Sequence, residues 1–168
     1  MRVPADALLG QEGQGFTIAM AALDKGRVSV AAGCVGIIAG CLESAREYAV
    51  QRTQFGRPIA SFQLVQEMIA DIAVDADAAR LLTWRAADLI ERHLPFTVEA
   101  SKAKLFASEA AVRAANLAVQ VFGGYGYIDD YPAQKYLRDA RVMTLYEGTS
   151  QVQKLLIGRA ETGVSAFL

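Results

Sequence analysis

The segment best suited to chemistry lies near the C-terminal end of the chain, where a carboxylate precedes an expected helix. Glu147 stands between Tyr146 and Gly148. Ser150 followed three residues later by Gln153 is a capping-box pattern, which predicts that a helix begins here. A carboxylate on a short connection at a helix start can be held in the fixed geometry that a general base requires. An ordinary turn is the alternative interpretation of the same residues.

A second candidate is an arginine on the apolar face of the first expected helix. Arg27 lies between Leu23 and Val30, which share this face at helical spacing. A charge in an apolar seam needs a partner or a function, because a bare buried ion is costly. A buried ion pair or a snorkelling side chain explains Arg27 as well as a ligand-binding role does.

Two loops carry residues suited to binding a phosphate or a flat ring. Residues 52 to 58, RTQFGRP, hold two arginines that suit phosphate, and Phe55, which is available for stacking on a ring. Residues 120 to 127, QVFGGYGY, hold three glycines that let a backbone approach a ligand. Each loop also has a plain structural interpretation, the first as an anchor over the core and the second as a helix C-cap.

Composition limits the classes of protein to consider. The 168 residues allow one domain with a buried core, 53% of them are hydrophobic, and a net charge of -1 offers nucleic acid no basic field. Cys34 and Cys41 share a helical face about 10 Å apart, too far for a disulfide, and indicate a reducing compartment. No metal site is expected, since His93 is the only histidine and no cluster of soft ligands accompanies it.

Neither a secretion signal nor a membrane span is expected. Residues 1 to 6 have no apolar core of the kind that a signal peptide carries. The longest uncharged run lies between Arg27 and Glu43, and its roughly 15 residues fall short of the ~20 that cross a bilayer.

Hydrophobic periodicity predicts an all-α chain. Apolar residues recur at spacings of three and four, and no alternation of period two persists, so no sheet is expected. The first expected helix begins near residue 16. Four more are expected at residues 62 to 92, 98 to 122, 132 to 138 and 150 to 159. The simplest fold is an antiparallel four-helix-type bundle over residues 16 to 160, with an irregular lead-in at 1 to 15 and a tail at 161 to 168.

Small residues on more than one helix face predict self-association as a dimer or tetramer, because a four-helix core cannot bury them all. The residues concerned are Gly33, Gly36 and Gly40 on the first helix and Ala100, Ala103, Ala107 and Ala111 on the third.

The order of the motifs resembles the C-terminal helical domain of the acyl-CoA dehydrogenases, flavin enzymes that oxidise acyl-CoA thioesters to 2-enoyl-CoA. The matching motifs, in family order, are LDKGR at 23 to 27, RTQFG at 52 to 56, QVFGG at 120 to 124 and YEGTSQ at 146 to 151. The resemblance covers nearly the whole chain and is greatest to short-chain and branched short-chain members. Residues 2 to 16 resemble the exit from the family's central β-domain.

The resemblance implies a role for each matched residue. Glu147 corresponds to the base that takes the α-proton of the thioester, while the β-hydrogen leaves as hydride to FAD. Some branches carry the base where this chain has Gly26, which leaves Glu147 as the only candidate. Flavin contacts are implied for Arg52, Gln54, Phe55, Gln63, Gln120, Gly123, Gly124, Thr149 and Gln151. Acyl-CoA contacts are implied for Asp24, Lys25, Gly26, Arg27, Gly148 and Arg159.

The resemblance also implies partners and a location. Family members reach a neighbour's FAD with the loops at residues 52 to 58 and 120 to 124, so a homo-oligomer is expected. Electron-transferring flavoprotein is the expected acceptor, and the cytoplasm or the mitochondrial matrix the expected location. Two alternatives remain open: a non-catalytic helical assembly module, from a fragment or split enzyme, and an acyl-CoA oxidase relative. Flavin content tests the first alternative, and oxygen reactivity of the reduced flavin tests the second.

Overall fold

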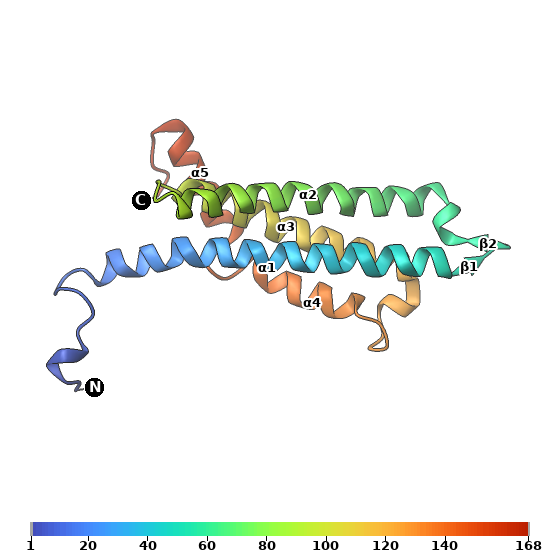
Figure 1. The fold of residues 1–168 in the computed structure, drawn as a ribbon, viewed down its shortest axis with the longest axis horizontal. Coiled ribbons are helices and arrows are strands. Elements are labelled where there is room, and N and C mark those ends of the chain that lie inside the picture. Colours follow the sequence, from blue (N-terminus) through green and yellow to red (C-terminus); the bar gives the residue numbers. More distant parts are fainter. Residues whose placement is uncertain (1, 168) are drawn as a thin grey trace.

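The computed structural model describes residues 2–167, and five α-helices carry most of them. The three long helices are α1 (Gly15–Gln51), α2 (Gln63–Glu91) and α3 (Thr97–Phe122), which pack side by side (Figure 1). Two shorter helices, α4 (Ala133–Met143) and α5 (Ser150–Thr162), pack against α3. The all-α bundle expected from the sequence is confirmed, and α4 extends further than the expected end at residue 138.

Short elements connect the helices. They are η1 (Ala5–Ala7) in the lead-in, β1 (Thr53–Gln54), β2 (Arg57–Pro58) and η2 (Ile59–Ser61) between α1 and α2, and η3 (Gly123–Gly126) after α3. The two strands form an antiparallel hairpin, so the expectation of no sheet is wrong at this one place in residues 2–167. Strands of two residues are too short to show the period-two alternation by which a sheet is predicted.

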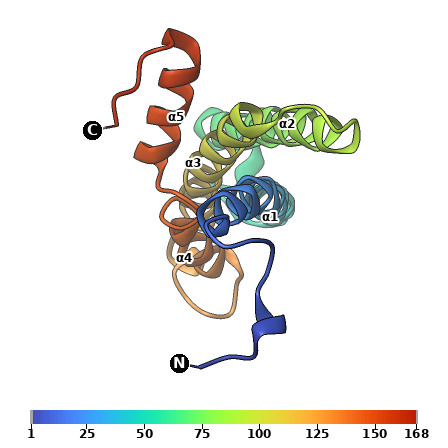
Figure 2. The ribbon, with the colours of Figure 1, turned by 90° about the vertical axis from the view of Figure 1, so that its left-hand side faces the viewer.

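Alanine on α3 builds the centre of the bundle. Ala103, Ala107, Ala110 and Ala114 are fully buried, as their spacing predicts. Because alanine side chains are short, the neighbouring helices can approach α3 closely. Figure 2 looks along the bundle and shows α3 with the other helices grouped around it. The central position of α3 allows one helix to contribute polar groups to sites shared with α1 and α5.

The alanines of α3 do not form an outer face. All four that were expected to support self-association are fully buried, so this part of the expectation is wrong: they are Ala100, Ala103, Ala107 and Ala111. Gly40 is internal too, since a Cβ there would lie 2.9 Å from the Tyr136 hydroxyl of α4. Only Gly33 and Gly36 remain open, with nothing within 4 Å of an added Cβ.

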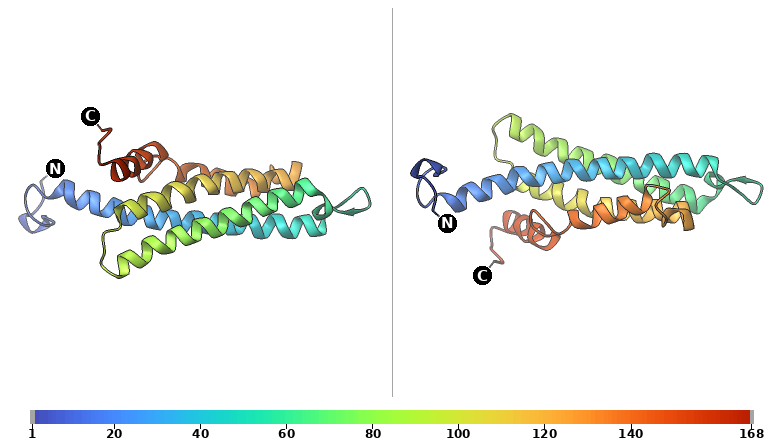
Figure 3. Two further views of the ribbon diagram at one scale, coloured as in Figure 1. Left: turned by 90° about the horizontal axis from the view of Figure 1, so that it is seen from above. Right: turned by 90° about the horizontal axis from the view of Figure 1, so that it is seen from below.

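Two loops lie at different ends of α1 (Figure 3). The hairpin follows the C-terminal end of α1, where the backbone N–H of Arg52 closes the helix on Tyr48. The connection between α4 and α5 carries Glu147 and lies beside the N-terminal half of α1, where Arg27 contacts it. These two loops hold six of the sixteen expected site residues: Arg52, Gln54, Phe55, Glu147, Gly148 and Thr149.

By length and composition alone, α1 is the one helix in residues 2–167 that could cross a membrane. One face of α1 is buried against its neighbours in the bundle, and Arg27 lies on that face. A core helix of a packed bundle passes the same test of length and composition. The helix therefore carries no argument for a membrane span.

Candidate functional site

Glu147 lies in a strained turn between α4 and α5, which we call the base loop (residues 144 to 149). The backbone φ of Glu147 is 56° and that of Gly148 is 87°. A positive φ is uncommon for a residue other than glycine, and such conformations cluster at functional sites. The backbone N–H of Glu147 has no acceptor among residues 2–167. The turn therefore presents both a carboxylate and a free N–H.

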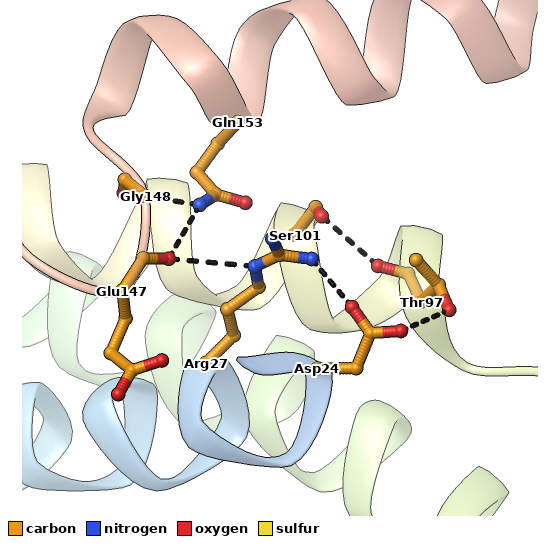
Figure 4. Close-up of polar contacts among 7 residues, drawn as sticks. All are labelled: Asp24, Arg27, Thr97, Ser101, Glu147, Gly148 and Gln153. Atoms are coloured by element: carbon orange, nitrogen blue, oxygen red, sulfur yellow. Dashed lines mark hydrogen bonds and ion pairs between the residues drawn. The ribbon is translucent and has the colours of Figure 1, made fainter. Parts of the chain in front are cut away.

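Donors from three helices hold the carbonyl groups of the base loop. The amide of Gln153, in α5, donates to the carbonyl oxygens of Glu147 at 3.0 Å and Gly148 at 3.1 Å. The Nε of Arg27, in α1, lies 3.4 Å from the Glu147 oxygen (Figure 4). The ammonium of Lys104, in α3, donates to the Gly148 oxygen at 2.7 Å. The loop conformation is thus fixed by side chains of the surrounding bundle.

Arg27 also forms a buried ion pair. Its guanidinium lies 2.5 Å from Oδ1 of Asp24, and the two side chains are 7% and 17% exposed. Thr97, at the start of α3, donates its hydroxyl to the other Asp24 oxygen at 2.6 Å (Figure 4). The ion-pair interpretation of Arg27 is therefore confirmed, and the same pair connects α1, α3 and the base loop.

The Glu147 carboxylate lies over the backbone of α1. In Figure 4 it points away from the Gln153–Arg27–Asp24 network. A Cβ built on Gly26 would lie 2.5 Å from its Oε2, so glycine at this position leaves the space that the carboxylate fills. Oε2 is buried and has no hydrogen-bond partner among the described residues. An unpartnered carboxylate oxygen beside an open helix backbone can accept a proton from a ligand.

The start of α5 differs from the capping box expected at Ser150. Thr149 is the N-cap, and its side-chain oxygen accepts from the backbone N–H of Val152 at 3.3 Å. Ser150 lies inside the helix and donates its hydroxyl to Glu109 of α3 at 2.5 Å. The Gln153 amide nitrogen donates to the base loop and its Oε1 has no partner among the described residues, so the returning bond of a capping box does not form. The expected helix start at residue 150 is right, and the expected cap is wrong.

The hairpin end of the bundle is open. Arg52, Gln54, Gly123 and Gly124 line one cavity of about 600 Å³. Phe55, at the hairpin tip, is 92% exposed and has a φ of 52°. A Cβ on Gly123 or Gly124 would meet nothing within 4 Å, so a ligand can reach their backbone. We call this region the hairpin end, and the surroundings of Glu147 the base end.

The remaining expected residues are exposed side chains near one end or the other. Gln63 opens α2 and Gln120 lies in the last turn of α3. Gln151 lies in the first turn of α5, Arg159 in its last turn, and Lys25 next to Gly26 on α1. The structure places none of these five in the polar network of Figure 4. The spatial grouping is therefore tighter for the base and its neighbours than for the expected ligand contacts.

The two ends are separated by most of α1. Gly26 and Arg52 are 26 positions apart, or roughly 39 Å along a helix axis at 1.5 Å per residue. The expected cofactor residues therefore fall into two groups, one near each end of this stretch of α1. Residues 2–167 contain no group of three metal-binding side chains.

Comparison with known proteins identifies the family. Residues 13–162 match the family model described as Acyl-CoA dehydrogenase, C-terminal domain. The chain belongs to this family. It is 54% identical over 157 residues to an acyl-CoA dehydrogenase of Bacillus subtilis (strain 168), a match that covers 94% of this chain and 41% of the relative.

Solved structures agree with this acyl-CoA dehydrogenase assignment. Butyryl-CoA dehydrogenase from Megasphaera elsdenii is 46% identical with a TM-score of 0.93, over 95% of this chain and 42% of that one. A chain from a study of the electron transferring flavoprotein of Acidaminococcus fermentans is 48% identical with a TM-score of 0.94, over 95% and 42%. The acyl-CoA dehydrogenase domain thus spans about two-fifths of the length of these relatives.

Sequence reasoning missed one buried cation of this acyl-CoA dehydrogenase domain. Lys104 is 0% exposed, and burial lowers the pKa of its ammonium, a shift that nearby Cys34, Glu109 and Glu147 oppose. Its position was a usable signal: Lys104 follows Ala103 and precedes Ala107 by three residues, so it shares their inward face. The Cys34 thiol is unsuited to nucleophilic chemistry, because burial raises its pKa to about 12.

Proposed function

We propose that the chain is the base-bearing domain of a flavin-dependent acyl-CoA dehydrogenase. The reaction is the α,β-dehydrogenation of an acyl-CoA thioester to a 2-enoyl-CoA, with Glu147 as the base. The single observation that carries this proposal is the state of the Glu147 carboxylate. Its Oε2 is buried without a partner, and it fills the space that Gly26 leaves on α1.

The proposed chemistry of the base end follows from two groups on one residue. Oε2 of Glu147 accepts the α-proton of the thioester. The free backbone N–H of Glu147 is available to donate to the thioester oxygen, and a donor there stabilises the negative charge that develops as the proton leaves. Gly26 lies against this carboxylate, and Arg27 and Gly148 hold the loop that carries it, which supports the assignment of these residues and of Asp24, the partner of Arg27, to the acyl-CoA site.

The hairpin end fits a cofactor with phosphates and flat rings. Exposed Arg52 and Phe55, together with the open backbone at Gly123 and Gly124, provide charge, a stacking surface and close approach. Bound FAD supplies the acceptor for the β-hydrogen as hydride. The residues assigned to hold it are Arg52, Gln54, Phe55, Gln63, Gln120, Gly123, Gly124, Thr149 and Gln151.

A homo-oligomer explains why the residues assigned to FAD lie in two separate groups. Since roughly 39 Å of α1 separates the ends, each end serves a different FAD, and the hairpin of one copy completes the site of another. Val74, Leu81 and Trp84 of α2 are 69%, 62% and 62% exposed, and they provide apolar surface for assembly. Sedimentation at high micromolar concentration tests this part: a monomer contradicts it.

The proposed partners are an acyl-CoA and an electron-transferring flavoprotein that reoxidises the cofactor. Similarity to a chain from a study of such a flavoprotein supports the second. The proposed location is the cytoplasm, or the mitochondrial matrix in a eukaryote.

The proposal is tested by Glu147→Gln in an enzyme that carries this domain with the remainder of an acyl-CoA dehydrogenase. The change is nearly isosteric, so fold and FAD content should persist. Anaerobic flavin reduction by acyl-CoA should slow by about 10² to 10⁴, the usual cost of removing a general base. Exposed Glu43→Gln is the control, and reduction at the wild-type rate in Glu147→Gln overturns the proposal.

A further inference from the structure

Two fully buried polar side chains reach the base loop from different helices. Lys104 of α3 and Gln153 of α5 are each 0% exposed. The Lys104 ammonium donates to the Gly148 oxygen at 2.7 Å, and the Gln153 amide donates to the Gly148 and Glu147 oxygens at 3.1 and 3.0 Å. Figure 4 shows the two Gln153 bonds. We call Lys104 and Gln153 the carbonyl clamp.

Packing alone gives no reason to bury Lys104. It is the largest fully buried side chain in residues 2–167, and none of the ion pairs of the described residues includes it. A methionine would fill the same space without desolvating a charge, and such replacements are often neutral or stabilising. A buried charge without an ion-pair partner lowers stability, so its presence in a core indicates a functional requirement.

The clamp fixes the backbone from which the base projects. A carbonyl oxygen held by a donor fixes the plane of its peptide group. Holding the oxygens of Glu147 and Gly148 fixes both torsions of Gly148 and the position of the Glu147 Cα, from which the carboxylate side chain extends. Gly148 itself leaves no room for a substitute, because an added Cβ would lie 2.5 Å from the Gln153 amide nitrogen.

We propose that Lys104 and Gln153 are positioning residues for proton abstraction by Glu147, an inference that rests on the proposed function. Both hold the base loop so that the carboxylate stays over Gly26. They differ in charge, since Lys104 also places a cation in the polar interior near Glu147 while Gln153 is neutral. Neither touches substrate or cofactor in this assignment, so both act through Glu147.

The test uses the full-length holoenzyme with Lys104→Met and Gln153→Leu. Each variant should slow anaerobic flavin reduction by about 10- to 100-fold, the usual effect of losing a positioning contact or of a small misplacement. The dissociation constant of acyl-CoA, FAD content and the Lys104→Met thermal midpoint should stay close to wild type. Lys102→Met is the control, because Lys102 pairs with Glu161 on the outside of α3 and should leave the rate unchanged.

The split between rate and binding separates positioning from loss of structure. A positioning role predicts that flavin reduction slows in both variants while the dissociation constant of acyl-CoA and the FAD content stay close to wild type. Loss of acyl-CoA or FAD binding in step with the rate contradicts the positioning role.

Failure of the clamp is distinguishable from failure of the proposed function. If Glu147→Gln blocks flavin reduction but both clamp variants reduce at the wild-type rate, the clamp is overturned and the base assignment stands. If Glu147→Gln itself reduces normally, the proposed function fails. Should Lys104→Met not fold, the rate of Gln153→Leu alone decides, because its two bonds hold both carbonyl groups.

Discussion

The base end and the hairpin end have the same local backbone conformation, but the side chains that surround it differ. Each has a residue other than glycine with positive φ followed by a glycine with positive φ: Glu147 at 56° and Gly148 at 87°, Phe55 at 52° and Gly56 at 76°. Glu147 is surrounded by donors from α1, α3 and α5. Phe55 is 92% exposed.

The difference shows what each end requires. At the base end the chain itself supplies the partners, so the geometry of Glu147 is complete within one copy. At the hairpin end an aromatic ring and an arginine are exposed, and within residues 2–167 they contact the aromatic rings of Phe62 and Tyr125, so their outer surfaces stay open to another molecule. The same kind of turn thus holds a fixed, hydrogen-bonded loop in one place and presents an exposed ring in the other.

The largest stability effect should come from breaking the buried ion pair of the base end. Arg27→Ala leaves the partly buried Asp24 with only the Thr97 hydroxyl, and removing one partner of a buried pair costs up to about 3–5 kcal/mol. Urea unfolding of the chain measures the loss. Arg80→Ala is the matched control: Arg80 pairs with Asp77 at the same spacing but in solvent, and its loss should be within error. Equal losses in the two variants would contradict the contrast between buried and exposed pairs.

Gly26→Ala should separate activity from stability. The new Cβ would displace the Glu147 carboxylate, and a misplacement of about 1 Å can cost 10²-fold in rate. Stability should rise slightly, because replacing glycine inside a helix gains about 1 kcal/mol. Flavin reduction and thermal unfolding report the two effects. Gly158→Ala, a helical glycine with open space around it, should gain stability without losing activity.

The two turns can be compared directly through their glycines. Gly148→Ala meets both an unfavourable φ and the Gln153 amide at 2.5 Å, whereas Gly56→Ala meets only the φ. A positive φ alone costs about 1–2 kcal/mol for alanine, so Gly56→Ala should lose about that much and Gly148→Ala clearly more. Denaturant midpoints of the two variants check this order. Reversal of the order would mean that the base loop is less constrained than its hydrogen bonds indicate.

The smallest effect on stability should come from the hairpin tip. Phe55→Ala removes an exposed ring and should change the unfolding free energy by no more than about 0.5 kcal/mol. In a complete enzyme the same change should lower the FAD retained after gel filtration, as read from the ratio of flavin to protein absorbance. Lower stability with unchanged FAD content would place Phe55 in the core rather than at a docking surface.

Helix periodicity and local motifs were enough to predict the fold and the location of Glu147. The cap was predicted one residue late, because Thr149 and Ser150 are equally good caps in isolation and the position of Glu109 decides between them. The role of Gln153 could not be predicted, since its amide bonds form only when α5 turns back onto the base loop. These two errors have one cause. The hydrogen-bond partner of a polar side chain on a helix depends on how the helices pack, and the sequence pattern does not give that packing.

The most direct test of the central claim moves the carboxylate from position 147 to position 26, on the opposite side of the space that the Glu147 carboxylate now fills. Glu147→Gly keeps a residue that accepts the loop's positive φ, and Gly26→Glu then puts a carboxylate where the two positions meet. Anaerobic flavin reduction by acyl-CoA is measured in the single and the double variant, each with its FAD content. We predict that Glu147→Gly falls to about a hundredth of the wild-type rate or less, and that the double variant recovers part of that loss. A wild-type rate in Glu147→Gly, or a folded double variant with full FAD no faster than the single one, would contradict the claim that Glu147 takes the proton in the space over Gly26.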